Sequence, residues 1–340
     1  MTRLLVGSYT PDGVGESLRL VERSDAGEWS ILHALAVSNP SFVARSDDLV
    51  FAVSEDESGS LGSFRLVGHS LEPVGRVEFG ERHPCHVVVA AEAAVALVAN
   101  YSSGSVTVVP FAADGTLGAP TTLPLPPRTG PNAERQEASH AHQVVPTPWG
   151  THLVSDLGGD VIHELVVERG GAATDGATTA TVRIARTVEV PAGAGPRHMV
   201  VRPGFLHVVG ELDGRVHTFS FDAHSHGYAG AEPTTAEPAA GPADVVQPSH
   251  LDASPSGRVL TVLNRGRDTI AVFDADRPEP VRVAEHTIGA AWPRHHAHVD
   301  ESTVVVAAQE GDALVELDLR SGAARRVLDL AAPACVLVLG

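Results

Sequence analysis

The sequence of 340 residues contains no lysine, so all 24 of its basic residues are arginine. Enzymes that form a Schiff base on a lysine amine are therefore excluded. Acidic residues number 42, and the formal net charge is −18. A chain of this charge lacks the cationic face that nucleic acid and anionic membranes require, so neither is expected as a partner. A requirement for solubility explains the acidity most simply.

Cysteines, aromatic residues and long apolar runs are also scarce. The two cysteines, Cys85 and Cys335, are too few for a disulfide framework, and we interpret both as small buried residues at strand starts. With 4% aromatic residues, the core must be packed mainly by valine, leucine and alanine. No apolar run is long enough to span a membrane, and the N-terminus lacks a signal-peptide pattern, so we predict a cytoplasmic protein.

What the sequence does contain is a repeated unit, and its clearest copy is residues 139–167. A polar opening with His140 and His142 leads into a short apolar run and a turn at residues 148–150. A second apolar run, a glycine-rich turn and the alternating run 161–167 complete the unit. Short apolar runs between Gly, Pro and Asp turns predict β-strands joined as hairpins.

Six copies of this unit follow one another along the chain. Their openings lie at Pro40, Pro84, His140, Pro196, Pro248 and Pro293, so the steps are 44, 56, 56, 52 and 45 residues. A seventh opening, Pro333, begins a last strand whose missing partners are residues 4–9 and 17–21 at the other end. Repeats of this length with several strands and no helical period indicate a β-propeller. We therefore predict an all-β, seven-bladed propeller that forms a single domain over residues 1–340, closed by pairing of the N- and C-terminal strands.

Four segments depart from this regular pattern. Residues 125–138 form the longest irregular stretch, and we expect a site-forming loop that carries Arg135, Gln136 and Glu137 to the opening at His140. The acidic loop 54–57 is either a solvated turn or a polar wall of a central site. Residues 168–180 are interpreted as a flexible outer hairpin. Residues 224–246 are similar, and their two histidines, His224 and His226, are weak evidence for a metal.

The openings carry the candidate site, because the first strand of each blade lines the central channel of a propeller and loops on a rigid scaffold usually hold function. Polar residues at the openings and the following turns are His86, His140, His142, Arg197, His198, Glu211, His250, Asn264, Arg265, Arg294, His295, His296 and Gln309. Arginine forks bind carboxylate and phosphate, so we predict an anion-binding pocket that contains titratable histidines. The alternative is structural: the histidines only satisfy backbone groups, and the arginines pair with acids of neighbouring blades.

Several short motifs occur in a characteristic order along the chain. They are residues 99–106 (ANYSSGSV), 135–137 (RQE) before 140–142 (HAH), 156–158 (DLG), 195–198 (GPRH), 211–212 (EL), 254–258 (SPSGR), 264–266 (NRG) and 292–294 (WPR). In this order they resemble the seven-bladed propeller lactonases, a family that includes the cycloisomerase-2 type 6-phosphogluconolactonases. The resemblance extends from residues 7–10 to residues 333–335, which is essentially the whole chain.

The resemblance implies hydrolysis of a sugar lactone, typically 6-phosphogluconolactone to 6-phosphogluconate in the pentose phosphate pathway. It places the catalytic residues at His142, Arg197, Glu211 and Arg265. Substrate-binding positions are assigned to His86, Asn100, Arg135, Gln136, His140, His198, Arg294 and Gln309. The family's Asn-Glu-Leu motif has become Gly210-Glu211-Leu212, which removes a side-chain hydrogen bond beside Glu211. No cofactor or metal is expected, the partner is a small anionic lactone, and the protein is expected to be a monomer or a weak homo-oligomer.

Roles for the four catalytic positions follow from the chemistry of lactone opening. His142 would activate water and later protonate the ring oxygen, and Arg197 would stabilise the oxyanion. Arg265 would hold the substrate anion. Glu211 would orient an arginine or histidine, or act as the base if its pKa were raised. Three rival interpretations stay open: a muconate-type cycloisomerase or lyase, a lactonase of other specificity, and a non-enzymatic scaffold with a dry or acidic channel mouth.

Overall fold

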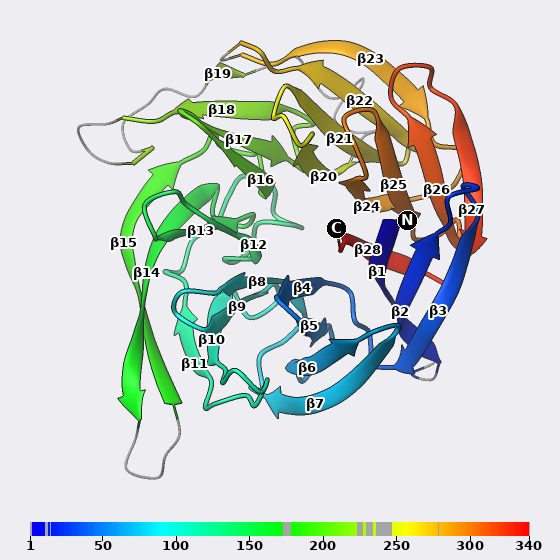
Figure 1. Cartoon of the computed structure of the whole chain (residues 1–340). Coiled ribbons are helices and arrows are strands. Elements are labelled where there is room, and N and C mark those ends of the chain that lie inside the picture. Colours follow the sequence, from blue (N-terminus) through cyan, green and yellow to red (C-terminus); the bar gives the residue numbers. More distant parts are fainter. Residues whose placement is uncertain are drawn as a thin grey trace.

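The protein is described from a computed structural model. The structure describes residues 2–339 except 11–12, 14, 173–177, 223–226, 229–233, 236–246 and 278. The described residues form seven four-stranded antiparallel sheets arranged as blades around a common centre, which we call the channel (Figure 1). The predicted seven-bladed β-propeller is therefore confirmed. None of the described segments is a helix able to cross a membrane.

Each blade is a meander whose strands run from the channel outward (Figure 1). Blade 1 contains β4 (Val43–Ser46), β5 (Leu49–Ser54), β6 (Ser60–Val67) and β7 (Ser70–Glu78). Blade 2 contains β8 (Pro84–Ala90), β9 (Val95–Asn100), β10 (Ser105–Pro110) and β11 (Thr121–Pro124). Blade 3 contains β12 (Ala141–Pro146), β13 (His152–Asp156), β14 (Val161–Ala172) and β15 (Thr178–Glu189).

The second half of the ring repeats the plan. Blade 4 contains β16 (Pro196–Arg202), β17 (Phe205–Gly210), β18 (Val216–Ser220) and β19 (Thr234–Thr235). Blade 5 contains β20 (Gln247–Ala253), β21 (Val259–Arg265), β22 (Thr269–Asp274) and β23 (Val281–Thr287). Blade 6 contains β24 (Pro293–His298), β25 (Thr303–Ala308), β26 (Ala313–Asp318) and β27 (Ala324–Asp329). Blade 7 contains β28 (Pro333–Val338), β1 (Thr2–Ser8), β2 (Glu16–Arg23) and β3 (Trp29–Ala36).

Blade 7 closes the ring with strands from both ends of the chain. β28 is its innermost strand and pairs antiparallel with β1, with Leu4 opposite Val338 and Leu5 opposite Leu337. β28 also contacts β4 of blade 1, so the innermost strands make an unbroken circle. The predicted pairing of the terminal strands is confirmed, and full closure leaves the innermost strands with neighbours on both sides.

Valine, leucine and alanine fill the space between neighbouring blades, as the low aromatic content predicts. Between blades 2 and 3, Leu97 and Val106 pack with Val154 and Leu165, and all four are fully buried. Strands β9 and β10 are buried along their whole length because a blade covers each face. Burial of each such side chain stabilises the fold by about 1.5–3 kcal/mol.

The structure describes only part of the irregular segments predicted from the sequence. β14 and β15 extend as a long hairpin beyond the ring (Figure 1), and the tip of this hairpin lies outside the described residues. His224 and His226 also lie outside the described residues, so the metal suggestion for that loop stays untested. The loop 125–138 returns to the ring beside Gly158. A Cβ atom on residue 158 would lie 1.7 Å from the Ala138 carbonyl oxygen, so this close approach requires glycine.

Candidate active site

The chain enters the innermost strands through a strained turn that places the openings on one face of the ring. The residue before the opening proline has a positive φ in five units, and three of these residues are His83, Trp292 and Ala332, with φ of 51°, 56° and 39°. Such a backbone is unfavourable for residues with a side chain, so the packing of the unit must hold it. The strand register then shifts beside the proline, for example between Pro84 and His86, which turns the following side chains towards the channel.

A buried carboxylate joins three arginines at this face. Glu211 Oε1 lies 2.6 Å from Arg135 Nη2, and Glu211 Oε2 lies 2.8 Å from both Arg197 Nε and Arg265 Nη2. We call these four residues the Glu211 cluster. They come from the loop 125–138, from the opening of blade 4, from the turn after β17 and from the end of β21, so one carboxylate connects three parts of the ring. The Arg197 guanidinium is fixed further by a hydrogen bond to the Ser249 carbonyl.

The Glu211 cluster stays charged although it is buried. Burial on its own would raise the pKa of Glu211, but the guanidiniums of Arg265, Arg197 and Arg135 outweigh it and hold the pKa well below its usual range. Burial, followed by the charge of Arg265, lowers the pKa of Arg197 to about 9, so this guanidinium is still protonated at pH 7. A base role for Glu211 would need a raised pKa, and this condition is not met. Three guanidiniums around one carboxylate leave an excess of positive charge.

The backbone holds Glu211 in place of the missing asparagine side chain. The Glu211 N–H donates to the Gly195 carbonyl at 2.9 Å, and the Gly210 N–H donates to the Arg215 carbonyl at 2.8 Å. A Cβ atom on residue 210 would lie 2.2 Å from Asp213 Oδ1 and 2.8 Å from the Ala194 carbonyl oxygen. Glycine is therefore required by this tight turn, and Glu211 keeps its position without an asparagine neighbour.

A second charged group lies at the openings of blades 6, 7 and 1. The Tyr9 hydroxyl donates to Glu55 Oε2 at 2.7 Å, and Arg294 Nη2 lies 3.7 Å from the same oxygen. Arg294 also stacks on the Tyr9 ring at 4.9 Å and donates a long hydrogen bond of 3.5 Å to Gln309 Oε1. The contacts of Arg294 are longer than those in the Glu211 cluster, and 17% of its side chain is exposed. Arg294 therefore has the loosest contacts of the four guanidiniums, which suits a further anionic partner, although Arg135 is more exposed at 36%.

Histidines at equivalent positions of five openings pack together in the channel. We call His86, His142, His198, His250 and His295 the histidine layer. The ring centroids of His250 and His295 are 3.7 Å apart, and His198 lies 4.8 Å from His250 and 5.4 Å from His142. In blade 1 the equivalent position is Phe42, whose ring lies 4.1 Å from the ring of His86. The repeated opening therefore does converge on the channel, as the repeat predicts.

The histidine layer is neutral at pH 7. Burial lowers the pKa of His86 and of His295 to about 3, and it lowers the pKa of His142 well below the usual value. The charges of Arg197, Glu211, Arg294 and Arg265 also act on the pKa of His142, so this ring lies among the charged groups of the channel face. Its Nδ1 atom is 4.0 Å from the Cys85 sulfur. A neutral imidazole beside guanidiniums keeps a lone pair that can accept a proton.

Three comparisons relate this geometry to known proteins. The family model described as "Lactonase, 7-bladed beta-propeller" matches residues 3–339. The chain belongs to this family. The family resemblance inferred from the motifs is therefore confirmed, and with it the prediction of a lactonase-type enzyme.

Known proteins of similar sequence or structure match most or all of the chain. The 6-phosphogluconolactonase of Bacillus subtilis is 28% identical over 82% of this chain and 79% of its own length. The solved periplasmic gluconolactonase of Pseudomonas aeruginosa is 27% identical, with a TM-score of 0.83 over 100% of this chain and 99% of its own. A solved protein of Lactobacillus plantarum is 26% identical, with a TM-score of 0.85 over the full length of both chains.

Some predicted positions lie in this candidate site and others do not. Arg135, on the loop 125–138, reaches Glu211, as expected for a site-forming loop. Its neighbour Gln136 is fully buried and donates to the Leu157 carbonyl at 3.0 Å, so it folds the loop onto blade 3. The Asn100 amide donates to Ser105 and Thr107 inside blade 2. His140 is held between the Tyr101 carbonyl and Glu137. Gln136 and His140 therefore have structural partners within the scaffold. Asn100 is bound only through its amide nitrogen, and among the described residues its Oδ1 atom is buried without a hydrogen-bond partner.

Two residues of the candidate site, Tyr9 and Tyr101, are missing from the predicted set, and a third, Glu55, lies in the acidic loop 54–57, for which a polar wall of the site was one of two interpretations. Tyr9 and Glu55 hold Arg294, and the Tyr101 hydroxyl accepts a hydrogen bond of 3.2 Å from Arg135. The Tyr101 ring also stacks on His140 at 4.5 Å. Each of the three follows the second strand of a unit read from the channel, next to a turn. Their equivalent places in the repeat were the signal that could have identified them.

Proposed function

We propose that the protein hydrolyses a sugar lactone, and that the substrate carries an anionic group as in 6-phosphoglucono-1,5-lactone. One observation carries the proposal. Glu211 holds three guanidiniums at distances of 2.6 to 2.8 Å, and the charges of this cluster act on the neighbouring neutral imidazole of His142. The names of the relatives from Bacillus subtilis and Pseudomonas aeruginosa support a lactone as the class of substrate.

In the proposed reaction, His142 takes a proton from a water molecule as the water oxygen attacks the lactone carbonyl carbon. The carbonyl electron pair moves to the oxygen, and Arg197 stabilises this oxyanion. Interactions of this kind are worth about 3–4 kcal/mol in the transition state. When the oxyanion collapses, the bond from the carbonyl carbon to the ring oxygen breaks, and His142 returns the proton to that oxygen. The product is a hydroxy acid, which releases one proton at neutral pH.

Glu211 is a positioning residue in this scheme. Its carboxylate orients Arg197 through a contact of 2.8 Å and holds the neighbouring Arg265 through another of 2.8 Å. Arg265 is stacked on Trp292 at 5.3 Å and would hold the anionic part of the substrate. Arg294, with its long contacts, would provide a second cation for that anion.

A panel of two lactones tests the proposal. Acid release from 6-phosphoglucono-1,5-lactone and from glucono-1,5-lactone is followed at pH 7, with the spontaneous rate subtracted. We expect turnover of the phosphorylated lactone with kcat/KM at least about tenfold above that of the plain one, because a bidentate arginine contact to an anion is lost with the plain lactone. Equal kcat/KM values for the two lactones would show that the protein does not recognise an anionic group on the substrate. No rate above the spontaneous one with either lactone would remove the lactonase function.

Two variants test the roles of the residues. His142→Ala is expected to lower kcat by about 10²–10⁴-fold, the usual range for general acid–base groups. Arg197→Ala is expected to lower kcat by about 10²–10³-fold, the effect of one oxyanion donor. His69→Ala, at an exposed turn of blade 1, is the matched control and should keep wild-type turnover. Wild-type turnover in both site variants, with folding verified by circular dichroism, would end this assignment of roles.

The rival functions give different results in the same assays. A cycloisomerase or lyase would convert a muconate-type diacid and leave both sugar lactones unchanged. A non-enzymatic scaffold is predicted to have a dry or acidic channel mouth, whereas here four arginines face two carboxylates at the openings. This excess of cations favours an enzyme or binding site for an anion.

A further inference from the structure

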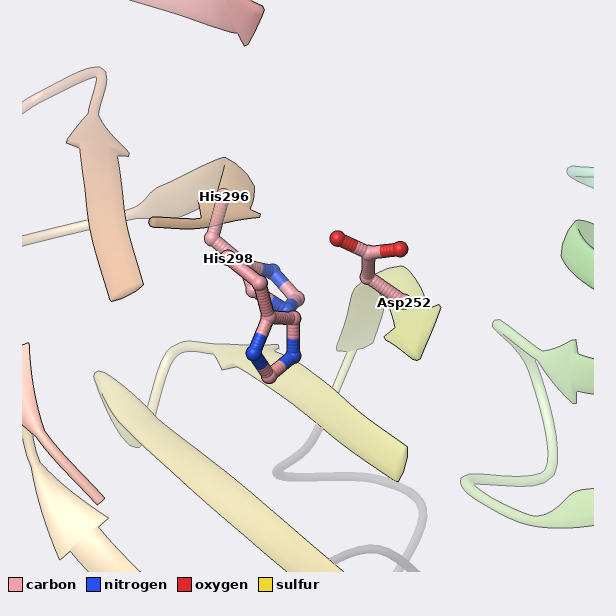
Figure 2. Close-up of side chains that lie close together, drawn as sticks. All are labelled: Asp252, His296 and His298. Atoms are coloured by element: carbon pink, nitrogen blue, oxygen red, sulfur yellow. The ribbon is translucent and has the colours of Figure 1, made fainter. Parts of the chain in front are cut away.

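A cluster of two histidines and an aspartate lies between blades 5 and 6, apart from the Glu211 cluster. Asp252 is on β20, and His296 and His298 are on β24; Figure 2 shows the two imidazole rings beside the aspartate carboxylate. Residues two apart on a strand project to the same side, so both rings face the neighbouring blade. One ligand atom from each of the three residues lies within 4.8 Å of the others. We propose that this cluster binds one divalent transition-metal ion, with Zn²⁺ as the best match.

The hydrogen bonds of Thr261 leave one nitrogen of each ring available. Thr261 Oγ1 lies 2.7 Å from His296 Nε2 and 2.9 Å from His298 Nε2. A hydroxyl oxygen can accept two hydrogen bonds, so both rings can carry their proton on Nε2 and donate it to Thr261. The Thr261 proton then points to the Asp252 carbonyl oxygen at 3.4 Å. This is how metal-binding histidines are usually held, with one nitrogen donating to an oxygen and the other free for the metal.

The second nitrogens support the same conclusion. Among the described residues, Nδ1 of His296 and Nδ1 of His298 are buried without a hydrogen-bond partner. His296 is completely buried, so water does not satisfy this atom from the surface. Two orphaned nitrogens in one cluster are unusual, because buried polar atoms nearly always have a partner. A metal ion would accept both lone pairs.

The donor set fits a transition-metal ion as well. The Asp252 carboxylate accepts a hydrogen bond from the Ala253 N–H at 2.8 Å, and ligating carboxylates are usually held by such a bond. Imidazole with one carboxylate suits Zn²⁺, Co²⁺ or Ni²⁺ better than Mg²⁺ or Ca²⁺, which prefer oxygen ligands.

The position of the cluster indicates a role in stability. Asp252 and His298 are half-buried and lie towards the ends of β20 and β24 that lead away from the openings. A metal held by both strands would connect blade 5 to blade 6 beneath the histidine layer. Three protein ligands also leave a fourth position for water. Because the ion would bind the folded ring and not the same residues in the unfolded chain, it would raise the melting temperature by mass action.

The test is a metal titration of the full chain after treatment with a chelator. Co²⁺ is added first, because it reports its ligands by visible absorption, and Zn²⁺ is then added in competition. We expect one equivalent to bind, and we expect Zn²⁺ to raise the melting temperature while Mg²⁺ and Ca²⁺ do not. Absence of binding, or non-specific uptake with no saturation at one equivalent, would overturn the proposal. This result needs no variant and does not depend on whether the protein hydrolyses lactones.

Variants locate the site. Asp252→Asn and His298→Gln keep the size of the side chains, and each should weaken Co²⁺ binding at least about tenfold, the usual effect of losing a ligand or a supporting group. The control is the double variant His224→Gln/His226→Gln, which removes the other candidate pair and should bind as wild type does. Loss of binding in the control with retention in Asp252→Asn would place the ion at residues 224 and 226 and refute the proposal. Thr261→Val provides a third test, because it removes only the acceptor of the two ring N–H groups and should weaken binding less.

Discussion

The Glu211 cluster and the histidine layer are neighbouring sets of buried ionisable side chains, and burial opposes charge in both. In the Glu211 cluster every guanidinium has a carboxylate oxygen within 2.6 to 2.8 Å, so Glu211 stays ionised. In the histidine layer no acidic group acts on the pKa of His86 or His295, and the charged side chains that do act are arginines, so burial prevails and lowers both values to about 3. The presence of an opposite charge, rather than depth, therefore decides whether a buried group is charged.

Removing the carboxylate breaks this comparison most severely. Glu211→Gln leaves the buried guanidiniums of Arg197 and Arg265, and the half-buried one of Arg135, close together without their counter-charge. We expect the free energy of unfolding to fall by about 3–5 kcal/mol, as for other buried ion pairs that lose one partner. Urea unfolding monitored by fluorescence measures this value. A loss below about 1 kcal/mol would show that Glu211 does not hold the arginines.

An exposed pair gives the control for this prediction. Arg76 Nη1 lies 3.3 Å from Glu78 Oε1, and their side chains are 55% and 63% exposed. Solvent screens this pair, so Glu78→Gln should change the free energy of unfolding by about 0.5 kcal/mol or less. A similar loss in both variants would mean that the effect comes from net charge and not from burial.

Acid should destabilise the protein through the histidine layer. The pKa of His86 and of His295 is about 3 in the folded state, against the usual value of 6.5. The unfolded chain binds protons that the folded layer does not, so stability is complete above pH 6.5 and is lost as the pH falls from there towards 3. Each such histidine contributes a slope of up to about 1.4 kcal/mol per pH unit.

Urea midpoints between pH 8 and pH 5 measure this loss. His295→Gln should flatten the slope between pH 6.5 and pH 5, whereas His69→Gln, at an exposed turn, should leave it unchanged. Constant stability of the wild type over this range would show that the buried rings are protonated in the folded protein.

The two thiols extend the comparison of buried groups with and without an opposite charge, because neither sulfur is bound to a cation. Burial raises the pKa of Cys85, and it raises the pKa of Cys335 to about 12. Both thiols are therefore protonated and covered, and we expect them to react with a disulfide reagent at pH 8 at least about 100-fold more slowly than in denaturant. Rapid labelling of one thiol in the folded protein would contradict this. Both cysteines are free and buried, as the sequence analysis predicts.

The smallest expected effect is on the pH dependence of turnover. Because burial lowers the pKa of His142 well below 6.5, the base is already unprotonated at pH 6. We expect kcat/KM for lactone hydrolysis to be flat between pH 6 and pH 8 after subtraction of the spontaneous rate, and to fall only at lower pH. An inflection near pH 6.5 would mean that the catalytic base is another group or that His142 is solvated.

The fold could be predicted from the sequence because the repeat specifies it several times over. Each opening supplies its own proline and turn, so an error at one unit does not alter the count of blades. The closing strand was identifiable because residues 333–338 had no partners of their own and residues 4–9 and 17–21 had no opening. The incomplete units at the two ends of the chain complement each other, and a closed ring is the arrangement that completes both.

The candidate site was predictable only in part, because the sequence gives positions but not the direction of a side chain. Arg197, Glu211 and Arg265 were expected to converge, and they do. Gln136 was grouped with Arg135 because the two are adjacent, yet adjacent loop residues point apart, and the Gln136 amide is bound to Leu157. The role of Tyr9 was hidden because its partners Glu55 and Arg294 are distant in sequence.

The pairing of β1 with β28 places the two chain ends side by side in one sheet. A gene in which a short linker joins these ends, and in which new ends are cut at the exposed turn between β26 and β27, would encode the same circle of blades in a rotated order. Every contact among Arg135, Glu211 and Arg265 would persist in such a protein. The order in which the ribosome makes the blades is thus separable from the geometry that surrounds the channel.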